Sequence, residues 1–235
     1  MSSPRTNTFE TAGNVLVTGT TSGMGRYIGE NITHEAINED TTEEYLGQLR
    51  GRSWNTIIHC AFNQRPGVTE ADLYNYLDDN LLLTLKLAAF QHARFVYLSS
   101  VDVYPRSLDP CSETDLPALD APAGLYATVK RMNESIVKKP CNRPLVLRCA
   151  ALCGKYSRKN SLIRIAEDDP CDLSLAGEST FNYVLHADVW EFVRTAIEKD
   201  LQGVYNIAAS DNIALEEVAS MLGKKVSFGK FVYET

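Results

Sequence analysis

One stretch near the start of the chain, Val15-Leu-Val-Thr-Gly-Thr-Thr-Ser-Gly-Met-Gly25, joins an apolar run to a glycine-rich turn. Residues 15–18 predict a short β-strand. Glycines in the pattern TGxxxGxG let the backbone turn tightly and approach a pyrophosphate, which can rest on the amides of the following helix. A glycine-rich surface turn is the alternative, but the position between a strand and a helix start favours a dinucleotide site. Its expected contacts are Gly19, Thr21, Ser22, Gly23, Met24 and Gly25.

Downstream of this turn, apolar runs alternate with segments of helical period. We expect strands at 56–61, 95–98, 145–147 and 204–207, and helices at 43–49, 72–92, 124–138, 187–199 and 215–222. Strands separated by helices pair in parallel through right-handed crossovers. The predicted fold is therefore α/β, a doubly wound parallel sheet of the Rossmann-like kind, with ligands at the carboxyl ends of its strands.

The segment after Gly25 is unusually short. A dinucleotide fold normally places a helix, a second strand, another helix and a third strand before the strand expected at 56–61. Only seventeen residues separate Gly25 from the helix expected at 43. Either the first helix is cut to about two turns and the second strand is vestigial, or residues 31–40 form an irregular strand. No residue is identified as the reader of the adenosine ribose, so NAD and NADP both stay open as cofactors.

Length and composition limit the organisation and the partners. With 235 residues, we expect a mobile tail at 1–12, a dinucleotide-binding core at 13–150, and a small C-terminal substrate lobe at 151–235 that is interleaved with the remaining core elements. A formal charge of −7 and the lack of long basic runs disfavour nucleic acid and membrane surfaces as partners. Six cysteines without a CxxC pair, several of them in apolar runs, indicate a reduced, cytoplasmic protein, and no metal site is expected.

The chemistry is suggested by Tyr126 and Lys130, which lie four residues apart on an expected helix and therefore point the same way. An ammonium beside a phenol lowers the pKa of the phenol, so that Tyr126 could exchange a proton near neutral pH. The expected strand at 95–98 delivers Ser99 and Ser100 at its end. A solvated lysine beside a half-buried aromatic ring is the alternative, but together with the glycine turn the set indicates an oxidoreductase site.

With these and further segments, the chain resembles the extended short-chain dehydrogenase/reductase family, in its NAD-dependent epimerase/dehydratase branch that acts on nucleotide sugars. The resemblance covers nearly the whole chain. It rests on these segments in this order: Val15-Leu-Val-Thr-Gly19, Ile57-Ile-His-Cys-Ala61 at the family's fourth strand, Asn80, Phe95-Val-Tyr-Leu-Ser-Ser-Val-Asp-Val-Tyr104, Tyr126-x-x-x-Lys130-x-x-x-Glu134, Leu147-Arg148, Asn182-Tyr-Val-Leu-His-Ala-Asp188-Val189 and Gly203-Val-Tyr-Asn-Ile207.

The resemblance implies a role for each matching residue. Ser100 would be the catalytic hydroxyl that meets the substrate oxygen, and Tyr126 the general acid/base. Lys130 would hold the nicotinamide ribose and keep Tyr126 acidic. Asn80 would support the active-site backbone. His59, Cys60 and Ala61 would contact the cofactor near its ribose, and Leu98 and Ser99 would lie beneath the nicotinamide. Asp102 would contact the substrate, and a turn-capping carboxylate is the alternative for it.

Departures from the family pattern narrow the expected reaction. Cys149, Ala151 and Cys153 stand where the family usually has Pro, Asn and Tyr, and the acidic pair of dehydratases is only half present as Val101-Asp102. We therefore favour ketoreduction or epimerisation of a nucleotide-linked hexose over elimination of water. The resemblance implies NAD or NADP as the cofactor and a homodimer built on the long helix and the Tyr126 helix. A catalytically inactive cofactor-binding sensor or scaffold is the alternative, and a reductase of small non-sugar ketones or aldehydes is a third.

Overall fold

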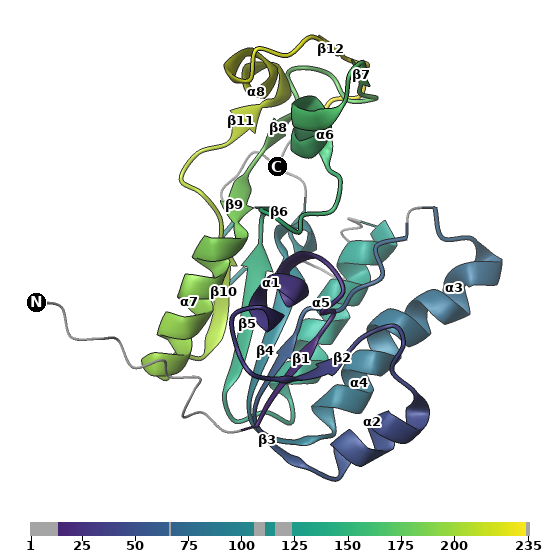
Figure 1. Cartoon of the computed structure of the whole chain (residues 1–235), viewed down its shortest axis with the longest axis vertical. Helices are drawn as coiled ribbons and strands as arrows, with labels where there is room; N and C mark the ends of the chain where they lie inside the picture. The colour runs from purple at the N-terminus through teal and green to yellow at the C-terminus, as the bar shows by residue number, and fades with distance from the viewer. Residues whose placement is uncertain (1–13, 66, 106–110, 116–123, 234–235) are drawn as a thin grey trace, which may run out of the picture.

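A six-stranded parallel sheet forms the body of the molecule in the computed structural model, which describes residues 14–65, 67–105, 111–115 and 124–233 (Figure 1). The tail expected at 1–12 lies outside these residues. All five neighbouring pairs are parallel, which confirms the predicted fold class. The strand order is β10-β5-β4-β3-β1-β2, with β1 Val15–Thr18, β2 Glu35–Ile37, β3 Ser53–His59, β4 Gln91–Ser100, β5 Pro144–Cys149 and β10 Gly203–Ile207.

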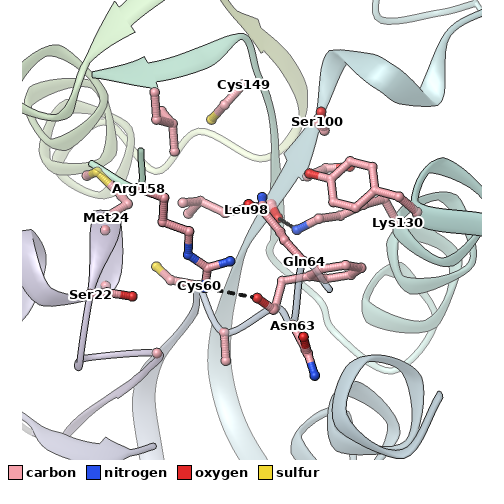
Figure 2. Close-up of a pocket in the computed structure, with 18 of the residues that line it drawn as sticks. Ser22, Met24, Cys60, Asn63, Gln64, Leu98, Ser100, Lys130, Cys149 and Arg158 are labelled. Atoms are coloured by element: carbon pink, nitrogen blue, oxygen red, sulfur yellow. Dashed lines mark hydrogen bonds between the residues drawn. The ribbon is translucent and has the colours of Figure 1, made fainter. Parts of the chain in front are cut away.

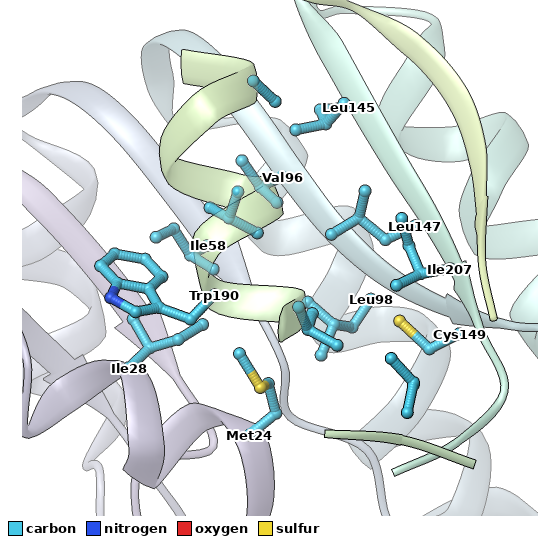
Figure 3. Close-up of a cluster of buried hydrophobic side chains, with 14 of the residues drawn as sticks. Met24, Ile28, Ile58, Val96, Leu98, Leu145, Leu147, Cys149, Trp190 and Ile207 are labelled. Atoms are coloured by element: carbon cyan, nitrogen blue, oxygen red, sulfur yellow. The ribbon is translucent and has the colours of Figure 1, made fainter. Parts of the chain in front are cut away.

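Helices cover both faces of the sheet, so its strands are apolar on both sides. Side chains alternate along a strand. Val96 of β4 packs with helices α1 (Gly23–Gly29) and α7 (His186–Glu198) in the cluster that Figure 3 shows. Tyr97 points to the opposite cluster, under α2 (Glu43–Arg50), α4 (Leu83–Ala88) and α5 (Gly124–Lys138).

The region after the glycine turn is shortened in the first of the two ways expected. Helix α1 has seven residues and β2 only three. The usual dinucleotide-binding order is 3-2-1-4-5-6, and here nothing pairs outside β2 among the described residues. The strand β3 therefore comes third in this chain, yet it lies beside β1 where the fourth strand of the usual order lies.

The long helix predicted at 72–92 is wrong in two respects. It is divided into α3 (Glu70–Leu77), a π-helical turn η1 (Asp78–Leu82) and α4. Residues 91–94 belong to β4, because their backbone continues the ladder with β3 at Ser53↔Gln91 and Trp54↔His92. Strand pairing thus overrides a polar local sequence that carries no strand pattern.

The smaller lobe lies beyond the carboxyl end of the sheet (Figure 1). The chain enters it after β5, returns to the sheet for α7 and β10, and enters it again. Its helices pack around Ile165 and Leu215. No helix in the described part of the chain combines the length and apolarity needed to cross a membrane. The lobe consists of β6 Ala151–Cys153, α6 Ser161–Glu167, β7 Cys171–Asp172, β8 Thr180–Phe181, β9 Tyr183–Leu185, β11 Ile213–Ala214, α8 Leu215–Met221 and β12 Val226–Ser227.

Candidate active site

A cavity of about 810 Å³ opens at the carboxyl end of the sheet, between the glycine turn, the ends of β3 and β4, helix α5 and the lobe (Figure 2). This is the edge at which parallel α/β sheets bind ligands. The structure brings most of the predicted site residues to this one space. They are Gly19, Thr21, Ser22, Gly23, Met24, Gly25, Cys60, Ala61, Leu98, Ser99, Ser100, Asp102, Tyr126 and Lys130.

The glycine turn has a shape that only glycine permits. Gly19 has φ +75°, and a Cβ there would lie 2.8 Å from the backbone of Ala61. A Cβ on Gly25 would lie 2.3 Å from the carbonyl oxygen of Gly19. These glycines let the turn pack closely on itself and on the end of β3 while its backbone lines the cavity, which fits the close approach of a dinucleotide pyrophosphate.

Ser100, Asp102 and Tyr126 form a hydrogen-bonded group at the other end of the cavity. Ser100 Oγ lies 3.1 Å from Asp102 Oδ2, to which it donates, and it also hydrogen-bonds with Tyr126. The hydroxyl of Tyr233, from the lobe, donates to Asp102 Oδ1 at 3.2 Å. The carboxylate of Asp102 is therefore held by the hydroxyls of Ser100 and Tyr233, in the same cavity as the phenol of Tyr126.

The expected effect of Lys130 on Tyr126 is wrong in this structure. Lys130 Nζ donates to the carbonyl oxygen of Leu98 at 2.7 Å and lies 4.1 Å from the ring centroid of Phe62, but 5.8 Å from that of Tyr126. Burial raises the pKa of Tyr126 to about 12, and the negative charge of Asp102 adds to this. Only the hydrogen bonds of the phenol, including the one with Ser100, act to lower this pKa.

Burial instead acts strongly on Lys130 itself. It lowers the pKa of this lysine, which lies near the thiols of Cys149 and Cys60, to about 7. Burial also raises the pKa of each of these thiols to about 12, so both are protonated and poor nucleophiles near neutral pH. Lys130 can therefore both donate and accept a proton in the physiological range.

The structure corrects the role expected for His59. Its side chain is 0% exposed and does not line the cavity. Thr84 Oγ1 donates to the carbonyl oxygen of Asn80 at 2.9 Å, so it accepts from His59 Nε2, also at 2.9 Å. Thr18 Oγ1 accepts the amides of Cys60 and Ala61 and donates to His59 Nδ1 at 2.7 Å. The neutral ring thus braces the strand ends behind the site, and burial lowers its pKa to about 3.

Asn80 also acts from behind the cavity wall. Its side chain accepts from the amide of Asn63 at 2.6 Å and donates to the carbonyl oxygen of the same residue at 3.1 Å. The π-helical turn η1 that carries Asn80 presents it to the loop after β3. Such turns are frequent at functional sites. Asn63 itself lines the cavity, so Asn80 holds part of its wall in place.

Comparison with known proteins places this chain in a family. The sequence profile of the NAD dependent epimerase/dehydratase family matches residues 31–208, which is more than half of the chain. The chain belongs to this family. A comparison with curated protein sequences finds no match.

Several solved structures share the fold of this family member. The dTDP-4-dehydrorhamnose reductase from Bacillus anthracis, in complex with NADP, superposes with a TM-score of 0.77 at 19% identity, over 94% of this chain and 83% of that chain. MoeE5 in complex with UDP-glucose and NAD gives 0.77 at 22%, over 95% and 88%. UDP-glucuronic acid 4-epimerase from Bacillus cereus, in complex with UDP-glucuronic acid and NAD, gives 0.73 at 20%, over 94% and 86%.

Beneath the site of this epimerase/dehydratase family member lies a buried ion pair that the sequence did not reveal. Arg148 Nε and Nη2 donate to the two carboxylate oxygens of Glu134 at 3.0 and 2.9 Å. The hydroxyl of Ser99 donates to Glu134 Oε1 at 2.7 Å, on the opposite side of β4 from Ser100. Arg148 Nη1 donates to the hydroxyl of Tyr104 at 2.7 Å. The network joins α5, which carries the candidate acid/base, to β4 and β5.

Other cavity residues of this family member were also missed. Gln64 hydrogen-bonds with Tyr126, and its position in a polar run directly after an apolar strand is a signal that could have indicated it. Glu39 lines the cavity just after β2, and locating that short strand would have identified it. Arg158 and Tyr233 reach the cavity from the lobe, and no local pattern marks either of them.

Proposed function

We propose that this protein is an NAD(P)-dependent oxidoreductase or epimerase that acts on a nucleotide-linked sugar, by ketoreduction or epimerisation at a hexose carbon. The observation that carries the proposal is the single cavity that joins the glycine turn to Ser100, Tyr126 and Lys130. Its volume is typical of a ligand site. The neighbours bound to UDP-glucose and to UDP-glucuronic acid support the substrate class.

Separate groups of residues would bind the cofactor and the substrate. The glycine turn, Cys60 and Ala61, Leu98 and Lys130 would hold the dinucleotide, whose nicotinamide supplies the hydride transfer when bound. Ser100 would bind the reacting oxygen of the substrate, and Tyr126 would exchange a proton with that oxygen. Asp102, which accepts from the Ser100 hydroxyl, would hold that hydroxyl in position for the substrate.

Substitution of Tyr126 tests this assignment. In Tyr126→Phe we expect turnover of UDP-glucose, UDP-glucuronic acid or dTDP-4-dehydrorhamnose to fall by about a hundredfold or more, while NADH binding stays within about threefold, since the hydroxyl does not carry cofactor affinity. Tyr205→Phe, which removes a hydroxyl on β10 that does not line the cavity, is the matched control and should keep full activity. Unchanged turnover in Tyr126→Phe would reject the proposal.

Within this proposal we favour NAD over NADP. Glu39 lines the cavity just after β2, where an acidic side chain binds the adenosine ribose hydroxyls of NAD and repels a 2′-phosphate. Lys86 also lines the cavity, but it is paired with Glu43 at 2.8 Å and is not free for a phosphate. Titration with NADH and NADPH should show tighter binding of NADH, and Glu39→Ser should reduce the difference. Tighter NADPH binding by the unmodified protein would contradict this preference.

A cofactor-binding sensor without turnover is the second candidate. It is favoured by the placement of Lys130, whose ammonium is engaged by the carbonyl oxygen of Leu98 at 2.7 Å and does not contact the phenol of Tyr126. NADH binding without turnover of any keto sugar would support the sensor. Turnover that depends on Tyr126 would exclude it.

We also propose a homodimer through the face formed by α3, α4 and α5. Large apolar side chains are exposed there, namely Leu73, Tyr74, Leu85, Leu125 and Met132. Exposed apolar patches of this kind mark interaction surfaces. Light scattering should give twice the chain mass of 26.1 kDa, and Leu85→Glu with Met132→Glu should give the monomer. A monomeric unmodified protein would contradict the proposal.

A further inference from the structure

The loop at residues 154–160, which follows β6, is fastened to the glycine turn on the outside of the cavity. The carbonyl oxygen of Tyr156 accepts the amide of Gly23 at 2.8 Å. The hydroxyl of Tyr156 bonds to Glu30, and the guanidinium of Arg26 lies 4.3 Å from the centroid of the Tyr156 ring. These contacts hold the loop against the turn.

Two residues further along, Arg158 crosses the cavity. Figure 2 shows its side chain pointing inward beside Met24 and Cys60, on the way from the glycine turn toward Lys130. Its Nη2 donates to the carbonyl oxygen of Phe62, on the far wall, at 3.2 Å. The loop and this side chain therefore bridge the space between the glycine turn and the end of β3.

In the part of the chain that the structure describes, the charge of Arg158 has no partner of opposite sign. Among the described residues, no carboxylate lies within 4.0 Å of its guanidinium, whereas the cations on either side of it are paired, Lys155 with Glu30 at 3.7 Å and Lys159 with Asp168 at 2.6 Å. A guanidinium has five N–H donors, and the bond to Phe62 uses one. Arg158 therefore faces the cavity with further donors available and with a positive charge that no carboxylate of the described residues pairs.

We infer that Arg158 binds the pyrophosphate of the dinucleotide from the lobe side, opposite the glycine turn. The inference rests on the proposed cofactor binding and adds a residue that the glycine pattern does not contain. Backbone amides alone give the phosphates dipoles, while the planar guanidinium adds a full charge and a bidentate match to phosphate oxygens. The lobe thus contributes to cofactor affinity as well as to the substrate end of the cavity.

The test compares ligands that contain and lack the pyrophosphate. Calorimetry with the full chain should show that Arg158→Gln weakens binding of NADH and of ADP-ribose by about tenfold or more, since a charged hydrogen bond is lost. Adenosine, which has no phosphate, should bind the variant and the unmodified protein equally. Lys159→Gln, which removes a neighbouring cavity-lining cation, is the matched control and should stay within about twofold.

The outcomes separate this inference from the proposed function. Arg158→Gln with an unchanged unfolding midpoint and unchanged NADH affinity would overturn the inference and leave the proposed function standing. Failure of the unmodified protein to bind NADH and ADP-ribose would overturn both. If Arg158→Gln does not fold, Arg158→Lys carries the test, because it keeps the charge but loses the bidentate geometry. It should bind ADP-ribose about threefold or more weakly, and an unchanged affinity would overturn the inference.

Discussion

Replacing Arg148 by methionine should destabilise the protein strongly, because it leaves the carboxylate of Glu134 buried without its main partner. Both side chains are 0% exposed, and the pair is bidentate. Burial acts to raise the pKa of Glu134, but hydrogen bonds from Arg148 and Ser99 outweigh it and hold this pKa below its usual value of 4.5. Glu134 is therefore ionised in the folded protein at neutral pH.

The size of the loss follows from what remains around the carboxylate. Breaking a buried ion pair by removing one partner costs about 3–5 kcal/mol. After Arg148→Met, Glu134 keeps the Ser99 hydroxyl at 2.7 Å and the more distant cations of Arg131 and Lys138 at 3.3 and 3.7 Å. These remaining contacts place the expected loss in the free energy of unfolding near the lower limit, about 3 kcal/mol.

Urea unfolding followed by circular dichroism would measure this loss at pH 7. The double variant Arg148→Met with Glu134→Met removes both charges, and it should recover most of the lost stability because apolar residues of similar volume often replace a buried pair without cost. The contribution of Glu134 is present above its unfolded pKa and disappears as the pH falls through its lower folded pKa, so the double variant should lose less stability in acid. A loss below about 1 kcal/mol in Arg148→Met, a value typical of exposed pairs, would refute this reasoning.

Three further substitutions probe the site. Gly25→Ala should lower the free energy of unfolding by about 2 kcal/mol and weaken NADH binding at least tenfold, because its Cβ would lie 2.3 Å from a carbonyl oxygen. Its control, Gly47→Ala on the open face of α2, should raise the free energy of unfolding by about 0.5–1 kcal/mol. Equal unfolding curves for the two variants would contradict this. Asn80→Ala should cost about 2 kcal/mol in urea unfolding, since it leaves the amide and carbonyl of Asn63 without partners, and a variant as stable as the unmodified protein would argue against the support role. Lys130 has a folded pKa of about 7 against 10.5 when unfolded, so between these values the unfolded chain binds the extra proton and stability should rise with pH. The unmodified protein should therefore gain about 2 kcal/mol relative to Lys130→Met between pH 7 and 9, and parallel pH curves would count against the lowered pKa.

The parts of this protein that depend on neighbouring residues could be predicted from its sequence. The glycine turn depends in part on a close backbone approach between Gly19 and Gly25, which are near in sequence, and helix α5 carries Tyr126 and Lys130 on a regular period. The alternation of strands and helices was also enough for the parallel sheet, whereas the short α1 and β2 were only one of two alternatives for the segment after the glycine turn.

What the sequence could not predict depends on contacts between distant segments. The partner of Lys130 is a backbone carbonyl on β4, and the partner of Glu134 is on β5, so neither follows from the spacing along α5. His59 was assigned to the cofactor because it sits beside Cys60 and Ala61, but alternation along β3 turns its ring into the core. Arg158 depends on how the lobe folds back over the sheet.

The π-helical turn η1 has a consequence for how such a site could be lost. A π turn contains one residue more than the α-helical turn it replaces, so the deletion of Asp79 would restore a regular helix and leave α3 and α4 in their present orientation. The carbonyl oxygen of Asn80, which now accepts from Thr84 and Asn133, would then return to the ordinary helical ladder. Loss of a single codon would thus disturb the support of the cavity wall but keep the helices on either side of it. A descendant chain could then keep this fold while losing the activity of the site.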